Sequence, residues 1–228
     1  VAPRAFATAV HPPDADGYCS LSLHAGATVG EIMRVVADPD RVLVAEASSR
    51  FPRTFGHGDY GHRLHVDQID VLIESDREPF LLADAEASEA DRAIADHVAS
   101  FIVEGSTLQT GIGGIPSRVA RMLAESDLGG FGVHSEMFTT GLMHLHKAGK
   151  VTNQKGIYDG VSITTFAAGT RELYDWLDEN TEVAFLPVGI VNSPELIAKN
   201  RRMVTINGAM ALDLSGQVVA DTIEGRQF

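Results

Sequence analysis

The amino-acid sequence predicts an α/β protein with two lobes, each built on a largely parallel sheet. Short apolar runs alternate with amphipathic helical segments along the chain, and this alternation is typical of βα units with parallel strands. An acidic stretch without periodicity, residues 74–87, separates two such series. The chain has 228 residues, of which 44% are hydrophobic and 21% charged, so it is long enough to bury a core in each lobe.

The first lobe is expected to contain one helix, a long loop and several strands. The helix is predicted at residues 28–36, because Val29, Met33 and Val36 recur on one helical face. Residues 52–65 are polar, glycine-rich and carry several histidines, which favours a loop. Apolar or alternating runs predict strands at residues 6–10, 18–23, 41–45 and 69–73.

The second lobe is expected to open with a well-signalled helix. Ser88 can cap this helix, and Asp91 lies three residues on, at the spacing of a reciprocal cap. The next helix is expected to start at Pro116, because the missing N–H of proline would be unpaired at the first helical position anyway. The other predicted elements are strands at residues 107–110, 182–186, 203–206, 209–214 and 217–220, a strand entering Glu136, a helix from there to Gly149, and a short helix opened by Ser193 and Pro194.

Charge and cysteine content narrow the classes of partner. The formal net charge is −13, which argues against nucleic acid or an anionic membrane surface as the partner. The single cysteine, Cys19, excludes an intramolecular disulfide and a cysteine-rich zinc site, and it fits a reducing compartment. No apolar stretch approaches the roughly 20 residues of a membrane span, and no signal peptide is apparent. A cytoplasmic location is therefore expected.

A glycine turn at residues 109–116, Gln-Thr-Gly-Ile-Gly-Gly-Ile-Pro, follows a predicted strand and opens a predicted helix. Ligands bind at this position in open α/β sheets, and the N–H groups of the helix N-terminus favour an anion. The turn is not a dinucleotide fingerprint, because the third glycine would fall on Pro116, and it is not a P-loop. The alternative is a tight βα turn that needs glycine only for its backbone dihedrals.

Glu136 lies in the run Gly-Val-His-Ser-Glu-Met-Phe, residues 132–138, between a strand-like and a helix-like segment. A carboxylate beside backbone donors could act as the nucleophile in acyl transfer from a thioester. The alternative is a helix-start glutamate that is favoured only by the helix dipole. His134, two residues earlier, shares the face of Glu136 on an extended strand. Ser135 lacks the glycines of a hydrolase nucleophile elbow.

The loop at residues 56–65 carries His57, His62 and His65 together with Asp59. Imidazole and carboxylate groups could bind a divalent metal. Their spacing matches no standard metal motif, however, and a polar or substrate-facing loop is the favoured interpretation. No metal is therefore expected.

Four stretches make the chain resemble the acetyl-CoA hydrolase/transferase family, close to the 4-hydroxybutyrate CoA-transferase branch of the family I CoA-transferases. They are residues 51–56 (Phe-Pro-Arg-Thr-Phe-Gly), 109–116, 132–138 and 206–218 (Ile-Asn-Gly-Ala-Met-Ala-Leu-Asp-Leu-Ser-Gly-Gln-Val). The resemblance covers essentially the whole chain, and the second and third stretches together are its most specific part.

The resemblance implies that Glu136 is the nucleophile. Its carboxylate would attack an acyl-CoA thioester, and the released CoA thiolate would then attack the glutamyl carbonyl to give a glutamyl-CoA thioester. Backbone amides of the glycine turn, with that of Ile112 as the best candidate, would stabilise the oxyanions. The implied oxyanion and CoA-binding residues are Gly111, Ile112, Gly113, Gly114 and Asn207, and the candidate substrate-facing residues are His134, Gln109 and Arg53.

The resemblance also implies how the chain is organised. Residues 1–84 would be the latter part of an N-terminal CoA-transferase domain, and residues 85–228 a C-terminal CoA-transferase domain that carries Glu136 and lacks a later glycine-rich segment. The chain is therefore expected to be an interior part of a longer two-domain protein. The expected ligands are coenzyme A, as acyl-CoA, and a small carboxylate, and a homo-oligomer is expected.

The leading functional hypothesis is a CoA-transferase that acts between short-chain carboxylates. An acyl-CoA hydrolase on the same scaffold is the runner-up, because the two differ only in whether an acceptor acid or water attacks the intermediate. A non-catalytic acyl-CoA-binding module would bind CoA without a covalent adduct. An α/β domain without a ligand would show no CoA-dependent rise in melting temperature.

Overall fold

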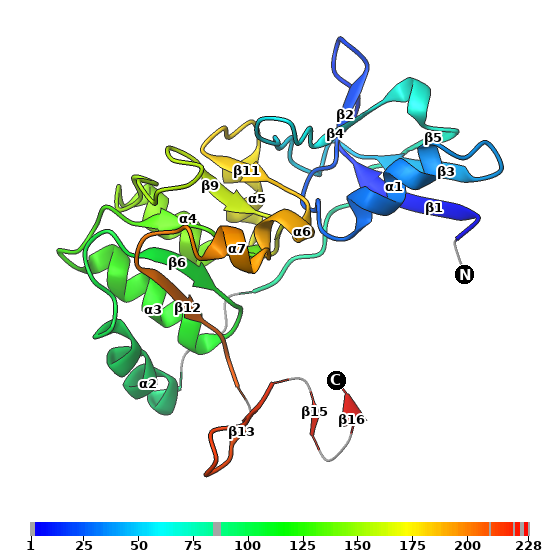
Figure 1. Cartoon of the computed structure of the whole chain (residues 1–228). Coiled ribbons are helices and arrows are strands. Elements are labelled where there is room, and N and C mark those ends of the chain that lie inside the picture. The colour runs from blue at the N-terminus through cyan, green and yellow to red at the C-terminus, as the bar shows by residue number, and fades with distance from the viewer. Residues whose placement is uncertain (1–2, 84–87, 210, 221, 224–225, 228) are drawn as a thin grey trace.

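The structure is a computed structural model that describes residues 3–83, 88–209, 211–220, 222–223 and 226–227. Figure 1 shows two groups of elements, one formed by the first third of the chain and the other by most of the rest, followed by an extended C-terminal segment. The α/β class and the prevalence of parallel strands are confirmed. The boundary predicted at residue 84 lies outside the described residues. No helix in the described ranges has the length and apolar character needed to cross a membrane.

A three-stranded parallel sheet forms the first lobe. Strand β3 (Val42–Ala47) lies between β1 (Ala5–Val10) and β5 (Val71–Glu74). Helix α1 (Thr28–Val36), at the predicted bounds, packs against β1 and β3. Ile32 and Val35 of this helix join a buried cluster whose other members include Val10, Leu43, Ala45 and Leu64.

An antiparallel pair, β2 (Tyr18–Ser20) with β4 (Arg63–His65), stands beside this sheet, and the short 3₁₀ helix η1 (Val66–Gln68) follows it. Two predictions need correction here. The strand predicted over residues 18–23 stops early, because Ser22 adopts a left-handed φ of 57° that a strand cannot continue through. The loop predicted over residues 52–65 ends in a strand, because its last three residues pair with β2.

The second lobe is centred on β6 (Thr107–Thr110), which lies between the parallel strands β12 (Met203–Ile206) and β7 (Gly132–Val133). A parallel bridge from His134 to Ile163 continues the sheet toward β9 (Ser162–Thr164). The remaining strands are β11 (Val183–Phe185), parallel to β9, and the parallel pair β8 (Met137–Phe138) and β10 (Phe166–Ala167).

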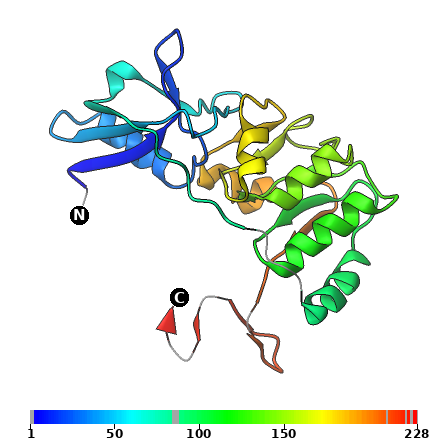
Figure 2. The same cartoon turned by 180° about the vertical axis from the view of Figure 1, so that it is seen from behind.

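Helices cover this sheet. Figure 2, seen from behind, shows α3 (Gly114–Glu125) and α4 (Thr140–Lys147) over the sheet, with α2 (Glu89–Ala99) packed against α3. The other helices are α5 (Arg171–Leu177), α6 (Val188–Val191) and α7 (Pro194–Ile197). A buried hydrophobic cluster lies between the sheet and the helices. Its members include Leu108, Val119, Leu123, Phe131, Val133, Phe138, Leu142 and Leu145.

Helix starts were well marked in the sequence. Ser88 and Asp91 make the predicted reciprocal cap of α2, with Asp91 N–H 3.1 Å from Ser88 Oγ and Ser88 N–H 2.9 Å from Asp91 Oδ2. Ser193 caps α7 as predicted. Helix α3, however, starts at Gly114 rather than Pro116. Proline fits two residues later because N–H groups throughout the first helical turn lack intrahelical acceptors.

The C-terminal segment leaves the second lobe after β12 (Figure 1). It forms the predicted hairpin between β13 (Ala211–Leu212) and β14 (Val218–Val219), with Gly216 at a φ of 88° in the turn. A second short antiparallel pair follows, β15 (Thr222–Ile223) with β16 (Arg226–Gln227).

Lys155 is a fully buried cation in the second lobe. Its Nζ donates to the carbonyl oxygens of Tyr158 at 2.5 Å and Val161 at 2.6 Å. Its aliphatic part packs so closely on β7 that a Cβ at Gly132 would lie 2.7 Å from the Cβ of Lys155. Burial lowers the pKa of Lys155 from 10.5 to about 8.

This pKa predicts a pH-dependent stability. Between pH 8 and 10.5 the unfolded chain keeps the Lys155 proton while the folded chain releases it, so the unfolding free energy should rise with pH across this window. The gain should be a few kcal/mol at most, at about 1.4 kcal/mol per pKa unit. Denaturant unfolding of the wild type and of Lys155→Met measures it as a difference, and a difference independent of pH would contradict the prediction.

Candidate active site

The glycine turn and the Glu136 run meet at the carboxyl ends of two neighbouring parallel strands, β6 and β7. His134 N–H donates to Leu108 O at 3.1 Å, which extends the strand pairing by one residue. Ser135 is fully buried and its Oγ lies 3.4 Å from both the N and the O of Thr110. The structure therefore brings together the two sequence runs that were singled out from their residue types.

Glu136 occupies a bend between β7 and β8, and its side chain is exposed. Its carbonyl oxygen accepts hydrogen bonds from Thr164 Oγ1 at 3.0 Å and from Thr165 N–H at 3.0 Å. The backbone is thus held while the carboxylate remains accessible. Strand β8 intervenes before α4 begins at Thr140, so the role of a helix-start glutamate does not fit this position.

Asn192 is the partner of the Glu136 carboxylate. It lies at the end of α6, and its Nδ2 donates to Glu136 Oε2 at 2.5 Å. No sequence pattern predicted a role for this residue. The available signal was the helix start at Ser193 and Pro194, which places Asn192 just before a helix but says nothing of a contact across 56 residues.

The glycine turn lies next to this edge of the sheet. The N–H of Gly111 donates to Ile206 O at 2.8 Å, so this predicted donor is already used. Within the described ranges, the N–H groups of Ile112 and Gly113 have no hydrogen-bond acceptor. Gly113 has a φ of 118°, which favours glycine, and a Cβ there would meet nothing within 4 Å. Of the predicted oxyanion donors, the amide of Gly111 is therefore excluded.

Gln109 and Asn207 form a reciprocal amide pair beside the turn. Gln109 Nε2 donates to Asn207 Oδ1 at 3.0 Å, and Asn207 Nδ2 donates to Gln109 Oε1 at 3.1 Å. The pair joins the carboxyl ends of β6 and β12. A Cβ at Gly111 would lie 2.9 Å from Asn207 Oδ1, so the lack of a side chain at Gly111 lets Asn207 approach the turn. Both predicted residues lie at the same sheet edge as the turn.

A cavity of about 170 Å³ borders the turn between α3 and α4. Its lining includes Ile112 and Gly113 of the turn and Thr139 and Thr140 at the start of α4, and Glu136 is not one of its lining residues. The glycine turn therefore forms one wall of a cavity, and the start of α4 forms another.

His134 points into the protein. The residue is only 2% exposed. Both ring nitrogens have hydrogen-bond partners within the chain: Nε2 lies 2.8 Å from Val191 O, and Nδ1 lies 3.1 Å from Asn200 Nδ2. Burial lowers the pKa of His134. A substrate-facing role was expected for it, but these contacts favour a supporting role behind Glu136.

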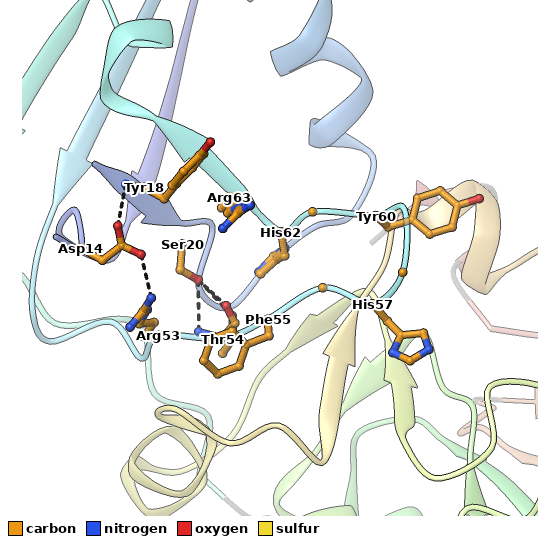
Figure 3. A pocket seen from close by; sticks show the side chains of 13 residues that line it. Asp14, Tyr18, Ser20, Arg53, Thr54, Phe55, His57, Tyr60, His62 and Arg63 are labelled. Carbon is orange, nitrogen blue, oxygen red and sulfur yellow. Dashed lines mark hydrogen bonds and ion pairs between the residues drawn. The ribbon is translucent and has the colours of Figure 1, made fainter. Parts of the chain in front are cut away.

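Arg53 lies elsewhere, in a cavity of about 260 Å³ between the β2–β4 pair and the loop before β4 (Figure 3). It pairs with Asp14 at 2.7 Å and with Glu179 at 3.4 Å. Glu136 does not line this cavity. Arg53 is thus the one candidate substrate-facing residue that the structure places in a separate cavity.

The histidine loop lines the same cavity, and its histidines have different surroundings. His62 is buried and stacked on Phe185 at 5.0 Å, and burial lowers its pKa to about 4. His65 contacts Asp67, whereas His57 lies against Tyr158. No group of three histidine, cysteine, aspartate or glutamate side chains in the described part of the chain could hold a metal ion.

Comparison with known sequences shows similarity to a CoA hydrolase and transferase family and to individual CoA-transferases. Residues 169–228 match the acetyl-CoA hydrolase/transferase C-terminal domain family. The chain is 36% identical over 220 residues to the 4-hydroxybutyrate coenzyme A transferase of Clostridium kluyveri. The aligned region covers 96% of this chain and 49% of that protein. It is 37% identical over 190 residues to the probable butyrate:acetyl-CoA coenzyme A-transferase of Syntrophomonas wolfei, with coverage of 82% and 42%.

The fold of the chain is similar to that of solved structures. RipA from Yersinia pestis superposes with a TM-score of 0.86 at 30% identity, over 95% of this chain and 48% of that one. The 4-hydroxybutyrate CoA-transferase from Porphyromonas gingivalis gives a TM-score of 0.85 at 32% identity, over 95% and 53%. The chain spans about half the length of the curated relatives it matches.

Proposed function

We infer, from the premise that this chain belongs to the acetyl-CoA hydrolase/transferase family, that the protein transfers CoA between short-chain carboxylates with Glu136 as its nucleophile. The observation that carries the proposal is the setting of Glu136. Its carboxylate is exposed, its backbone is held by the end of β9 and the residue that follows, and it lies at the same sheet edge as the two amides of the glycine turn that have no acceptor among the described residues.

The proposed reaction consists of two half-reactions, one with the acyl-CoA donor and one with the acceptor carboxylate, and each half-reaction has two carbonyl substitutions. A Glu136 oxygen attacks the thioester carbonyl, and departure of the CoA thiolate leaves a mixed anhydride. The thiolate then attacks the glutamyl carbonyl, which releases the first carboxylate and forms glutamyl-CoA. An acceptor carboxylate then attacks this thioester, which expels the CoA thiolate and gives a second mixed anhydride. The thiolate finally attacks the acceptor's acyl carbonyl, which frees Glu136.

Asn192 and the glycine turn have distinct parts in this proposal. The Asn192 amide holds Oε2 of Glu136, which leaves Oε1 free to attack. The amides of Ile112 and Gly113 are proposed to stabilise the oxyanion that forms in each tetrahedral intermediate, and one such donor is typically worth about 10²–10³ in rate. Gln109 and Asn207 are proposed to contact the thioester end of CoA.

The test uses the protein in its longest expressible form with butyryl-CoA and acetate. A transferase forms acetyl-CoA only when acetate is present, and it shows ping-pong kinetics. Free CoA released at the same rate with and without acetate would instead indicate an acyl-CoA hydrolase, the alternative that the family description also names. CoA binding without any turnover would contradict both and support a binding module.

Replacing Asn192 with alanine is expected to slow CoA transfer without unfolding the protein. The change removes a hydrogen bond to a carboxylate, which is worth about 1.5–3 kcal/mol, so kcat should fall by roughly 10- to 100-fold. The measurement is steady-state kcat beside the melting temperature. A kcat within twofold of the wild type would show that the contact does not matter for turnover.

The domain assignment forms part of the same proposal. We propose residues 1–84 as the latter part of an N-terminal CoA-transferase domain and residues 85–228 as the C-terminal domain that carries Glu136. A cytoplasmic homo-oligomer is proposed as the working state, and sedimentation of the purified protein tests the oligomer.

A further inference from the structure

Two contacts join the segment of His134 and Glu136 to the end of α6. His134 Nε2 lies 2.8 Å from Val191 O, and Asn192 Nδ2 lies 2.5 Å from Glu136 Oε2. Val191 and Asn192 are adjacent in the chain, and His134 and Glu136 are two residues apart. The direction of the Asn192 amide therefore depends on where the Val191 carbonyl is held.

The Val191 carbonyl and Asn200 together fix which nitrogen of His134 carries the proton. The carbonyl oxygen can only accept, so Nε2, 2.8 Å away, must be the donor. Asn200 Nδ2 lies 3.2 Å from Leu196 O and 3.1 Å from Ile197 O, both of which are acceptors in α7. Its amide cannot be flipped, because Oδ1 would then face two carbonyl oxygens. The Nδ2 group therefore also faces His134 Nδ1 at 3.1 Å, and Nδ1 must be the acceptor. The ring proton is left on Nε2, where it donates to Val191 O.

The contact between His134 and Asn200 is buried, and it leaves one polar atom without a partner among the described residues, which lowers the stability of the fold. His134 is 2% and Asn200 7% exposed. Within the described part of the chain, Asn200 Oδ1 is buried without a hydrogen-bond donor, and an unsatisfied buried oxygen destabilises the folded state. Protonation of His134 would set two donors against each other at Nδ1. The neutral ring with its single N–H at Nε2 is thus the form that fits.

We propose that His134 and Asn200 are positioning residues that orient Asn192, and through it the Glu136 carboxylate, for attack on the thioester. This inference rests on the proposed function. The ring N–H of His134 holds the Val191 carbonyl, and Asn200 keeps that N–H in place. Loss of the contact would release the end of α6, so Asn192 would no longer hold Oε2 of Glu136. CoA binding at the glycine turn would be unaffected, because none of these contacts involves the turn.

The test compares two amide replacements at His134. In His134→Gln the side-chain nitrogen takes the place of Nε2 and can still donate to Val191 O. In His134→Asn it takes the place of Nδ1 and cannot. The rate of glutamyl-CoA formation in a single turnover should fall about tenfold in the asparagine variant, the value of one typical hydrogen bond. The glutamine variant should retain most of the rate, and the KM for acyl-CoA should stay within twofold in both.

A double variant tests whether His134 acts through Asn192. If it does, His134→Asn should cost little further rate once Asn192→Ala is present, because coupled residues are not additive. Equal rates in the two His134 amide variants, or multiplying effects in the double variant, would overturn the proposal. If the His134 variants do not fold, Asn200→Leu, which removes the donor that faces Nδ1 and so loosens the ring, should lower the same rate with an unchanged KM.

A measurement independent of turnover separates this inference from the proposed function. Long-range ¹⁵N–¹H correlation spectra of ¹⁵N-histidine-labelled protein report which ring nitrogen of His134 is protonated. A neutral ring protonated at Nε2 in the wild type, whose Nδ1 loses the ¹⁵N shift of a hydrogen-bonded acceptor in Asn200→Leu, supports the positioning contact even if the protein proves inactive. A ring protonated at Nδ1, or a charged ring at neutral pH, overturns it whatever the activity.

Discussion

The Glu136→Gln variant is expected to fold and to lose CoA transfer almost completely. Glutamine keeps the size of the side chain and can still contact Asn192, but its amide is not a nucleophile toward a thioester. Removal of a nucleophile that forms a covalent intermediate typically costs on the order of 10³-fold or more in kcat. The measurement is kcat for acyl exchange, with the melting temperature as the check on folding.

Glu125→Gln is the matched control for this change. Glu125 is an exposed glutamate at the end of α3, outside the contacts that hold Glu136, so its replacement should leave kcat unchanged. If Glu136→Gln turned over within a few-fold of the wild type, Glu136 would not be the nucleophile.

The second large effect is expected from Gly113→Val. A branched side chain at a φ of 118° strains the turn, and its Cβ would project into the open space beside the amides of Ile112 and Gly113. CoA would then be kept from the backbone, and the oxyanion donors would move. We expect a higher KM for acyl-CoA and a loss of about 10²-fold or more in kcat/KM, since one oxyanion donor is worth about this much.

Two further variants separate the effect of the turn from that of added bulk. Gly30→Val places the same side chain in α1, where a Cβ would also meet nothing within 4 Å and φ is not in the left-handed region, and it should change neither constant. Ile112→Ala should have little effect, because the proposed role of Ile112 is that of its backbone amide. An unchanged KM for acyl-CoA in Gly113→Val would contradict the role of the turn.

The main features of the second lobe followed from periodicity and from glycine. Strands β6 and β12 have the predicted bounds, because each is a short run between clear turn signals. Parallel strands end at one edge of their sheet, which is why the glycine turn and Glu136 could be expected to meet. The strands between residues 150 and 181 were not predicted, because strands of two or three residues are too short to show alternation.

The site contacts that were missed depend on long-range packing. Alternation along a strand gave His134 and Glu136 a common face, but it could not show that α6 and α7 would cover His134 and leave Glu136 exposed. The pairing of Asn192 with Glu136 depends on where a four-residue helix ends. Arg53 was grouped with the site by resemblance alone, whereas its ion pairs with Asp14 and Glu179 hold it in another cavity.

The most direct test of the account is the intact mass of the protein, in its longest expressible form, after brief incubation with acetyl-CoA. A glutamyl-CoA intermediate predicts a gain equal to CoA minus water, located on the peptide that contains Glu136 and absent from Glu136→Gln. A folded protein that binds CoA yet gains no mass, or gains it on a peptide without Glu136, would contradict the assignment of Glu136 as the nucleophile of a CoA-transferase.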